Sequence, residues 1–151
     1  MKNNIFSLLI LLAFLLNLTS CAQEHDALDL LSEFVDAYGA DGVIYSPKIA
    51  EGNAGYITEG LIESVYVFSG DLPENYAIML SSGTESFSEC GVFVCDGGED
   101  LLSVEEMCLE RIKLLCGRDG RGFVKISGMT VFYSTMKDRE RAEMLWREII
   151  R

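Results

Sequence analysis

Two short runs flank the dipeptide Gly128-Met129 and constrain the fold more than any other feature of the chain. Residues Phe123–Ser127 and Thr130–Ser134 are rich in β-branched and aromatic side chains, as strands are. Glycine at the first of two linking positions suits a type II′ hairpin turn. That turn sets the following facing pairs: Ile126 with Val131, Val124 with Tyr133, and Lys125 with Phe132. We therefore predict a hairpin with one apolar and one mixed face, typical of a sheet that is covered on one side.

Three segments carry apolar residues at helical spacing. The first spans residues 27–38, and Gly39 suits its end. The second is predicted to span residues 103–116, because Ser103-Val104-Glu105-Glu106 has the form of a capping box. The third follows Asp138, a good N-cap residue.

Further strands are predicted at Tyr76–Ser81 and Gly91–Cys95, which are apolar and bounded by turn residues. The segment Leu61–Ser69 fits a helix or a strand, and its part Val65-Tyr66-Val67-Phe68 favours a strand. One helix separates strands that are otherwise neighbours in sequence. We therefore predict an α+β domain, with an antiparallel-rich sheet of about four to five strands and helices packed on one face in two layers.

The N-terminal residues have the anatomy of a signal peptide. Lys2 precedes the run Ile5–Leu16, which is apolar except for Ser7 and is shorter than the roughly 20 residues of a membrane-spanning helix. The next segment, Leu18-Thr19-Ser20-Cys21, resembles the lipobox of bacterial lipoproteins, in which the cysteine takes a diacylglycerol and becomes the new N-terminus. The alternative is an ordinary secretory signal or an uncleaved anchor, with Cys21 incidental.

We expect a signal peptide at 1–20, a lipidated tether at 21–26 and a single α+β domain at 27–151. Acyl chains on Cys21 would hold the domain at the extracytoplasmic face of the cell membrane. The single histidine, His25, falls in the tether. A triad built on serine or cysteine with histidine is therefore not predicted.

The charge of the chain restricts its partners. Without residues 1–20, whose one charged side chain is Lys2, 11 basic residues stand against 24 acidic ones, a net charge of −13. Such a surface opposes binding to nucleic acid phosphates, so we expect no nucleic acid partner. The expected partners are the membrane, through the N-terminal lipid, and an unidentified protein or envelope component.

Four cysteines lie beyond the leader, at Cys90, Cys95, Cys108 and Cys116, and they allow three complete pairings. Neither the first two nor the last two can close within one strand or helix, because their Cα atoms would lie too far apart. If the helix packs back along the preceding strand, Cys90–Cys116 is the favoured bridge. The alternative is that all four are small buried hydrophobic residues.

No motif indicates a metal, a cofactor or a catalytic residue. Cysteine and histidine lack zinc spacing, and Asp96–Asp100 lacks the alternating ligands of a calcium loop. It is better explained as a solvated loop. Glu85 and Glu89 lie close in sequence as a carboxylate pair, but the sequence gives no sign that they converge, so we nominate neither.

The second half of the chain resembles small bacterial lipoproteins that carry domain of unknown function 4358. The resemblance begins with a cysteine-flanked strand, Glu89-Cys90-Gly91-Val92-Phe93-Val94-Cys95, which a long helix follows. It continues with a glycine hairpin, formed by Val124-Lys125-Ile126-Ser127-Gly128 and Val131-Phe132-Tyr133-Ser134, and with a closing charged helix. The leader and the length agree, whereas the four cysteines depart from the pattern. The family has no assigned activity, so the resemblance implies no catalytic residue.

These features together predict a membrane-anchored binding or interaction module. The alternative is an envelope hydrolase that uses carboxylates as acid and base. A thiol-based redox role is disfavoured, because the chain has no CxxC motif.

Overall fold

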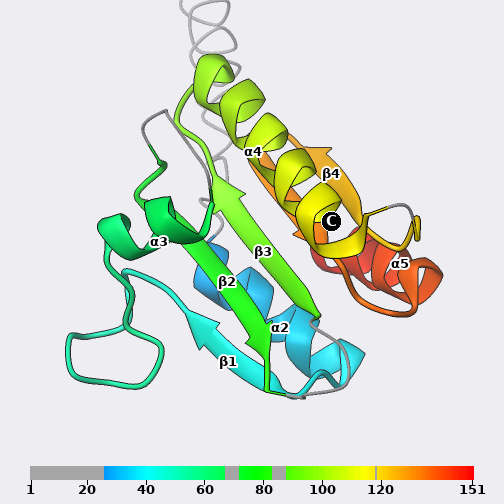
Figure 1. Ribbon diagram of the computed structural model, residues 1–151, viewed down its shortest axis with the longest axis horizontal. Helices are drawn as coiled ribbons and strands as arrows, with labels where there is room; N and C mark the ends of the chain where they lie inside the picture. The colour runs from blue at the N-terminus through cyan, green and yellow to red at the C-terminus, as the bar shows by residue number, and fades with distance from the viewer. Residues whose placement is uncertain (1–25, 67–71, 83–87, 118) are drawn as a thin grey trace, which may run out of the picture.

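The computed structural model describes residues 26–66, 72–82, 88–117 and 119–151 (Figure 1). This part of the chain contains four helices and five strands. In chain order they are α2 Ala27–Tyr38, β1 Gly42–Tyr45, α3 Glu59–Val65, β2 Asn75–Ser81, β3 Glu89–Val94, α4 Gly98–Cys116, β4 Phe123–Ser127, β5 Thr130–Ser134 and α5 Arg139–Ile149.

The five strands form one open sheet in the order β1-β2-β3-β5-β4. Every neighbouring pair is antiparallel. The long connection from β3 to β4 runs through α4, and β5 then returns to lie between β3 and β4. The predicted α+β class with an antiparallel sheet is confirmed.

Helices cover both faces of this sheet, so the predicted two-layer arrangement with helices on one face is wrong. Ala77 and Met79 of β2 pack with α2 and α5, whereas Tyr76 and Ile78 pack with α3 and α4. Figure 1 shows α4 in front of the sheet and α2 behind it. The physical reason is that all five residues of β5 are buried. A strand that is covered on both faces lacks the alternation of buried apolar and exposed polar residues that marks a sheet covered on one face.

The β4–β5 hairpin has the predicted register. Val124 pairs with Tyr133, and Lys125 pairs with Phe132. Gly128 has a φ of +59°, and no residue other than glycine in the described part of the chain has a positive φ. This combination fits a type II′ turn, in which the first central residue alone has positive φ.

The ends of α2 and α5 also follow the sequence. The Asp26 side chain accepts a hydrogen bond from the Leu28 amide at the start of α2, and Gly39 ends that helix with a φ of +73°. The Asp138 side chain accepts from the Arg141 amide at the start of α5. Side-chain capping therefore sets where these helices begin.

The start of α4 differs from prediction, and the structure decides between the two alternatives for part of a second segment. Helix α4 begins at Gly98, with Gly97 as N-cap and acidic residues in its first turn, which favour a helix N-terminus. The Ser103 hydroxyl donates to the Glu99 carbonyl from inside the helix, so it caps nothing. Of the segment Leu61–Ser69, which fits a helix or a strand by sequence, the first part belongs to helix α3, Glu59–Val65, with Ile62 buried against the sheet. Val67 and Phe68 of the favoured strand lie outside the described residues.

The predicted leader and tether, including Cys21 and His25, lie outside the described residues. Within the described ranges, no helix combines the length and the apolar character needed to cross a bilayer.

Candidate functional site

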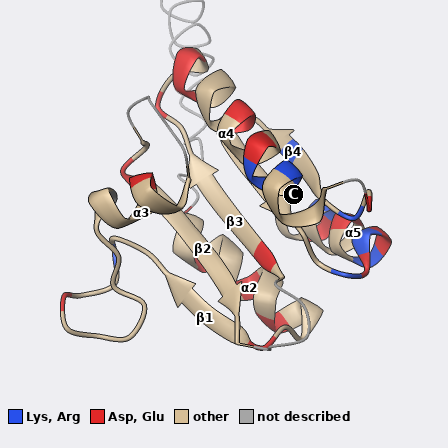
Figure 2. Cartoon of the chain, viewed as in Figure 1, with Lys and Arg blue, Asp and Glu red and all other residues tan. Residues whose placement is uncertain are grey.

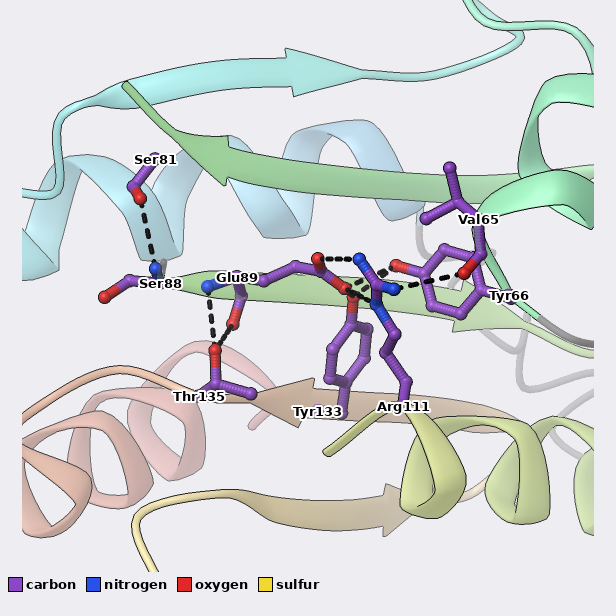
Figure 3. A network of polar contacts seen from close by, with 8 residues as sticks. All are labelled: Val65, Tyr66, Ser81, Ser88, Glu89, Arg111, Tyr133 and Thr135. Atoms are coloured by element: carbon purple, nitrogen blue, oxygen red, sulfur yellow. Dashed lines mark hydrogen bonds and ion pairs between the residues drawn. The ribbon is translucent and has the colours of Figure 1, made fainter. Parts of the chain in front are cut away.

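The candidate site is centred on Glu89, the first residue of β3, whose side chain is buried (Figure 3). Its backbone is held by Thr135, just beyond β5. The Glu89 amide donates to Thr135 Oγ1 at 2.8 Å, and the Thr135 amide donates to the Glu89 carbonyl at 2.8 Å. The pairing of β3 with β5 thus positions the Glu89 side chain.

Arg111, from α4, binds this carboxylate with two nitrogen atoms. Its Nε donates to Glu89 Oε1 at 2.9 Å, and its Nη2 donates to Oε2 at 2.7 Å. Hydrogen bonding to Glu89 raises the pKa of Arg111 above its ordinary value. The side chain of Arg111 is 18% exposed and that of Glu89 is 4% exposed. The two charges therefore form a bidentate ion pair that is largely removed from water.

Two tyrosines complete the network. The Tyr66 hydroxyl donates to Glu89 Oε1 at 3.0 Å, the Tyr133 hydroxyl donates to the same oxygen at 2.5 Å, and the two hydroxyls also contact each other. Burial, followed by the charge of Glu89, raises the pKa of Tyr66 well above its ordinary value. Burial, Tyr66 and Glu89 do the same for the pKa of Tyr133. Both phenols therefore act as protonated donors.

The guanidinium of Arg111 makes further contacts that fix its position. Its Nη1 donates to the Val65 carbonyl at 3.1 Å, and its central carbon lies 5.3 Å from the centroid of the Tyr66 ring. A guanidinium carries five N–H groups. The hydrogen bonds within the described chain use three of them, so two donors are left for another group.

The ion pair lines a cleft of about 400 Å³. The size is within the range of small-molecule sites, about 300–1,000 Å³. Its apolar lining comes from Val43, Tyr45, Leu80 and Leu115. Hydroxyl groups come from Ser81, Ser82 and Ser88. The cleft thus combines apolar walls with a few polar groups, as ligand sites do.

None of the four network residues, Glu89, Arg111, Tyr66 and Tyr133, is predicted as a site residue by the sequence. These residues come from the end of α3 and from β3, α4 and β5, and Glu89 is 22 residues from Arg111 and 44 from Tyr133. Sequence spacing carries no sign of such a contact. A charged residue directly before an apolar strand was the one available signal, and it pointed to Glu89. Glu85, its suggested carboxylate partner, lies outside the described residues.

The cysteines do not form the predicted bridge. Cys90, Cys95, Cys108 and Cys116 are free and buried. Cys90 packs with α2 and α5, whereas Cys116 ends α4 on the opposite face. Alternate side chains of a strand point to opposite faces, so Cys90 points away from α4. The structure thus argues against a Cys90–Cys116 bridge and fits the alternative of buried apolar thiols.

In the part of the chain that the structure describes, His, Cys, Asp and Glu side chains form no group of three or more able to hold a metal ion. Asp96 and Gly97 lie in the connection from β3 to α4, whereas Gly98, Glu99 and Asp100 belong to the first turn of α4, so only the first part of the predicted loop Asp96–Asp100 is a loop. Comparison of the chain with protein-family models gives no match, and comparisons with curated proteins and with solved structures give none either. The resemblance to the lipoproteins with domain of unknown function 4358 stays a prediction.

Proposed function

We propose that this protein is a lipid-anchored binding domain, held at the extracytoplasmic face of the membrane through Cys21, with its ligand site in the Glu89–Arg111 cleft. The observation that carries the proposal is the bidentate ion pair in the wall of a cleft of about 400 Å³. Apolar residues of similar volume commonly stabilise a fold as well as a buried ion pair does. The pair is therefore better explained by recognition than by stability.

The position of the cleft relative to the tether supports the proposal. The amide of Ala27, at the start of the domain, donates to Asn75 Oδ1 at the start of β2. Ser81, at the end of β2, lines the cleft. A strand of this length spans roughly 20 Å. A tether at residues 21–26 would therefore hold the domain by one end and leave the cleft at the other, open to the cell exterior.

The alternative of a carboxylate hydrolase has less support. Glu89 Oε1 accepts three hydrogen bonds, from Arg111 and both tyrosines. A general acid or base must exchange its proton with a substrate at hydrogen-bond distance. Oε1, which already accepts three donors, is poorly placed to do so, and Oε2 is held by Arg111 Nη2 at 2.7 Å. The arrangement is better suited to holding a ligand than to moving a proton.

Anchoring is tested first, by replacing Cys21 with alanine and separating membranes from soluble material. We expect the unchanged protein in the membrane fraction. Protease added to whole cells should digest it. Metabolic labelling with fatty acid should be lost in Cys21→Ala. Fatty acid labelling that persists in this variant would overturn the anchor.

Ligand binding is tested with the lipidated full chain in detergent. Val43, which lines the cleft on edge strand β1, and Ile126, on edge strand β4, are each 40% exposed and make a matched pair. An envelope extract fraction is expected to raise the Tm of the unchanged protein and of Ile126→Trp but not of Val43→Trp, because the indole fills the cleft. An equal shift in both variants would place the ligand elsewhere.

A further inference from the structure

We propose that the cleft binds a neutral saccharide, through the paired acceptor and donors that Glu89 and Arg111 offer and through the apolar wall beside them. This inference rests on the proposed function, because it names the ligand class of the same cleft. Three features carry it: the charge of the pair, the placement of its hydrogen-bonding atoms, and the composition of the walls.

The charge of the pair selects a neutral ligand. Arg111 and Glu89 neutralise each other at 2.7 Å, so neither offers an unbalanced charge to a ligand ion. The chain as a whole has a net charge of −12, which disfavours the approach of an anion. Among the described residues, the other polar groups that line the cleft are the hydroxyls of three serines and of Tyr45, and no second acidic or basic side chain lines it. A ligand without charge therefore meets the smallest electrostatic penalty here.

The hydrogen-bonding atoms select a pair of neighbouring hydroxyl groups. Within the described residues, Glu89 Oε2 accepts from Arg111 Nη2 alone, whereas Oε1 accepts from three donors. A carboxylate oxygen has room for a further donor, and two N–H groups of Arg111 are left. An acceptor and donors thus lie side by side. Adjacent hydroxyls of a sugar match them, because each hydroxyl both donates and accepts.

The walls fit the rest of a sugar ring. The ring of Tyr45 and Leu80 offer apolar surface for the C–H face of a pyranose, while Ser82 and Ser88 offer hydroxyls for its polar edge. Mixed lining of this kind fixes the orientation of a small ligand. The volume of about 400 Å³ suits a mono- or disaccharide.

The test uses saturation-transfer NMR on the lipidated full chain in nanodiscs. The probes are the neutral sugars cellobiose, maltose and N,N′-diacetylchitobiose, the anion glucose 6-phosphate, and the blocked peptide N-acetyl-trialanine amide. We expect transfer to at least one neutral disaccharide, with affinity for glucose 6-phosphate lower by about tenfold or more. Transfer should be lost in Val43→Trp and kept in Ile126→Trp.

Three results would overturn the inference. Transfer to the blocked peptide alone makes the cleft a peptide site, and transfer to glucose 6-phosphate alone makes it an anion site. Both leave the proposed binding function intact. Absence of transfer to every probe overturns the saccharide as ligand, and the envelope-extract experiment then decides whether the cleft binds anything. If that experiment also gives no shift, the proposed function fails as well.

Discussion

Glu89 places a carboxylate where the side chain is 4% exposed, and Arg111 compensates that charge. Breaking a buried ion pair on one side leaves an uncompensated charge, which costs about 3–5 kcal/mol. We therefore predict that Glu89→Gln lowers the free energy of unfolding by about this amount, as measured by urea denaturation. Glu110→Gln is the control, because the Glu110–Lys113 pair is exposed and contributes at most about 1 kcal/mol.

A double variant separates charge from packing. In Glu89→Gln with Arg111→Met, the unpaired guanidinium is gone while Gln still accepts from the tyrosine hydroxyls. We expect this variant to regain most of the stability lost in Glu89→Gln. If the double variant is as unstable as the single one, the loss comes from packing or from the tyrosine hydrogen bonds and not from the charge.

The two network tyrosines make stability depend on pH in the alkaline range. Burial and the charge of Glu89 raise the pKa of Tyr66 and Tyr133 in the folded protein, whereas unfolded tyrosine titrates near pH 10. Above about pH 10 the folded state binds more protons than the unfolded state. The contribution of the two tyrosines to the free energy of unfolding is therefore predicted to be constant below about pH 10 and to fall as the pH rises further.

The measurement is the urea midpoint between pH 8 and pH 11. The double variant Tyr66→Phe with Tyr133→Phe lacks both titrating groups, so its midpoint should decline less steeply than that of the unchanged protein. Identical slopes for the two proteins would assign the alkaline loss to other groups.

At the scale of elements, the β4–β5 turn depends on Gly128, whose φ is +59°. A side chain in this left-handed region costs about 1–2 kcal/mol. We predict that Gly128→Ala lowers the free energy of unfolding by that amount. Gly98→Ala is the control: its backbone is helical, and a Cβ there meets no atom within 4 Å. It should be neutral or stabilising by up to about 1 kcal/mol. Equal effects of the two substitutions would contradict the turn assignment.

Local chemistry explains which elements could be predicted. The hairpin, the two capped helices and their ends follow from residues next to one another, such as Gly128 and Asp138. The start of α4 was placed five residues late, because Ser103 has capping chemistry that the structure does not use. The segment Leu61–Ser69 fits a helix or a strand by sequence, because the buried contacts of α3 with the sheet are invisible to local propensity.

The candidate site was beyond prediction for the same reason. Tyr66, Glu89, Arg111 and Tyr133 become neighbours through the strand order and the packing of α4. Until β5 is known to lie beside β3, nothing links Glu89 to Tyr133. The number of layers depends likewise on where α4 packs, and α4 was predicted on the same face as α2.

At the scale of the whole molecule, positive charge is gathered in one region. Of the 11 Lys and Arg residues beyond the leader, ten lie at or after Arg111. Among the described residues, Figure 2 shows most Lys and Arg around α5 and the C-terminal half of α4, while Asp and Glu occur throughout. The acidic side chain of Glu143, in α5, pairs with several of these basic residues. It forms ion pairs with Lys125, Arg139 and Arg147, and its hydrogen bond with Arg139 is the main cause that lowers its pKa.

The two helical layers share the sheet, so we predict that they unfold as one unit. Cys90 reports on the layer of α2 and α5, and Cys108 reports on the layer of α3 and α4. Both are fully buried. Alkylation under native conditions, read by peptide mass spectrometry, should give the same opening free energy for both thiols. Faster labelling of Cys108 would show that one layer opens alone. Denatured, unreduced protein should label at all four thiols.

The strand order also sets when the site is completed during synthesis. The β4–β5 hairpin closes over two residues, whereas β3 pairs with β5 across the whole of α4 and β4. Contacts between distant segments form late, because closing a long loop costs entropy. A chain that ends after α4 holds Glu89 and Arg111 but lacks Tyr133 and Thr135. A growing chain therefore completes the hydrogen-bond network around Glu89 after the C-terminal hairpin has been made and has joined the sheet.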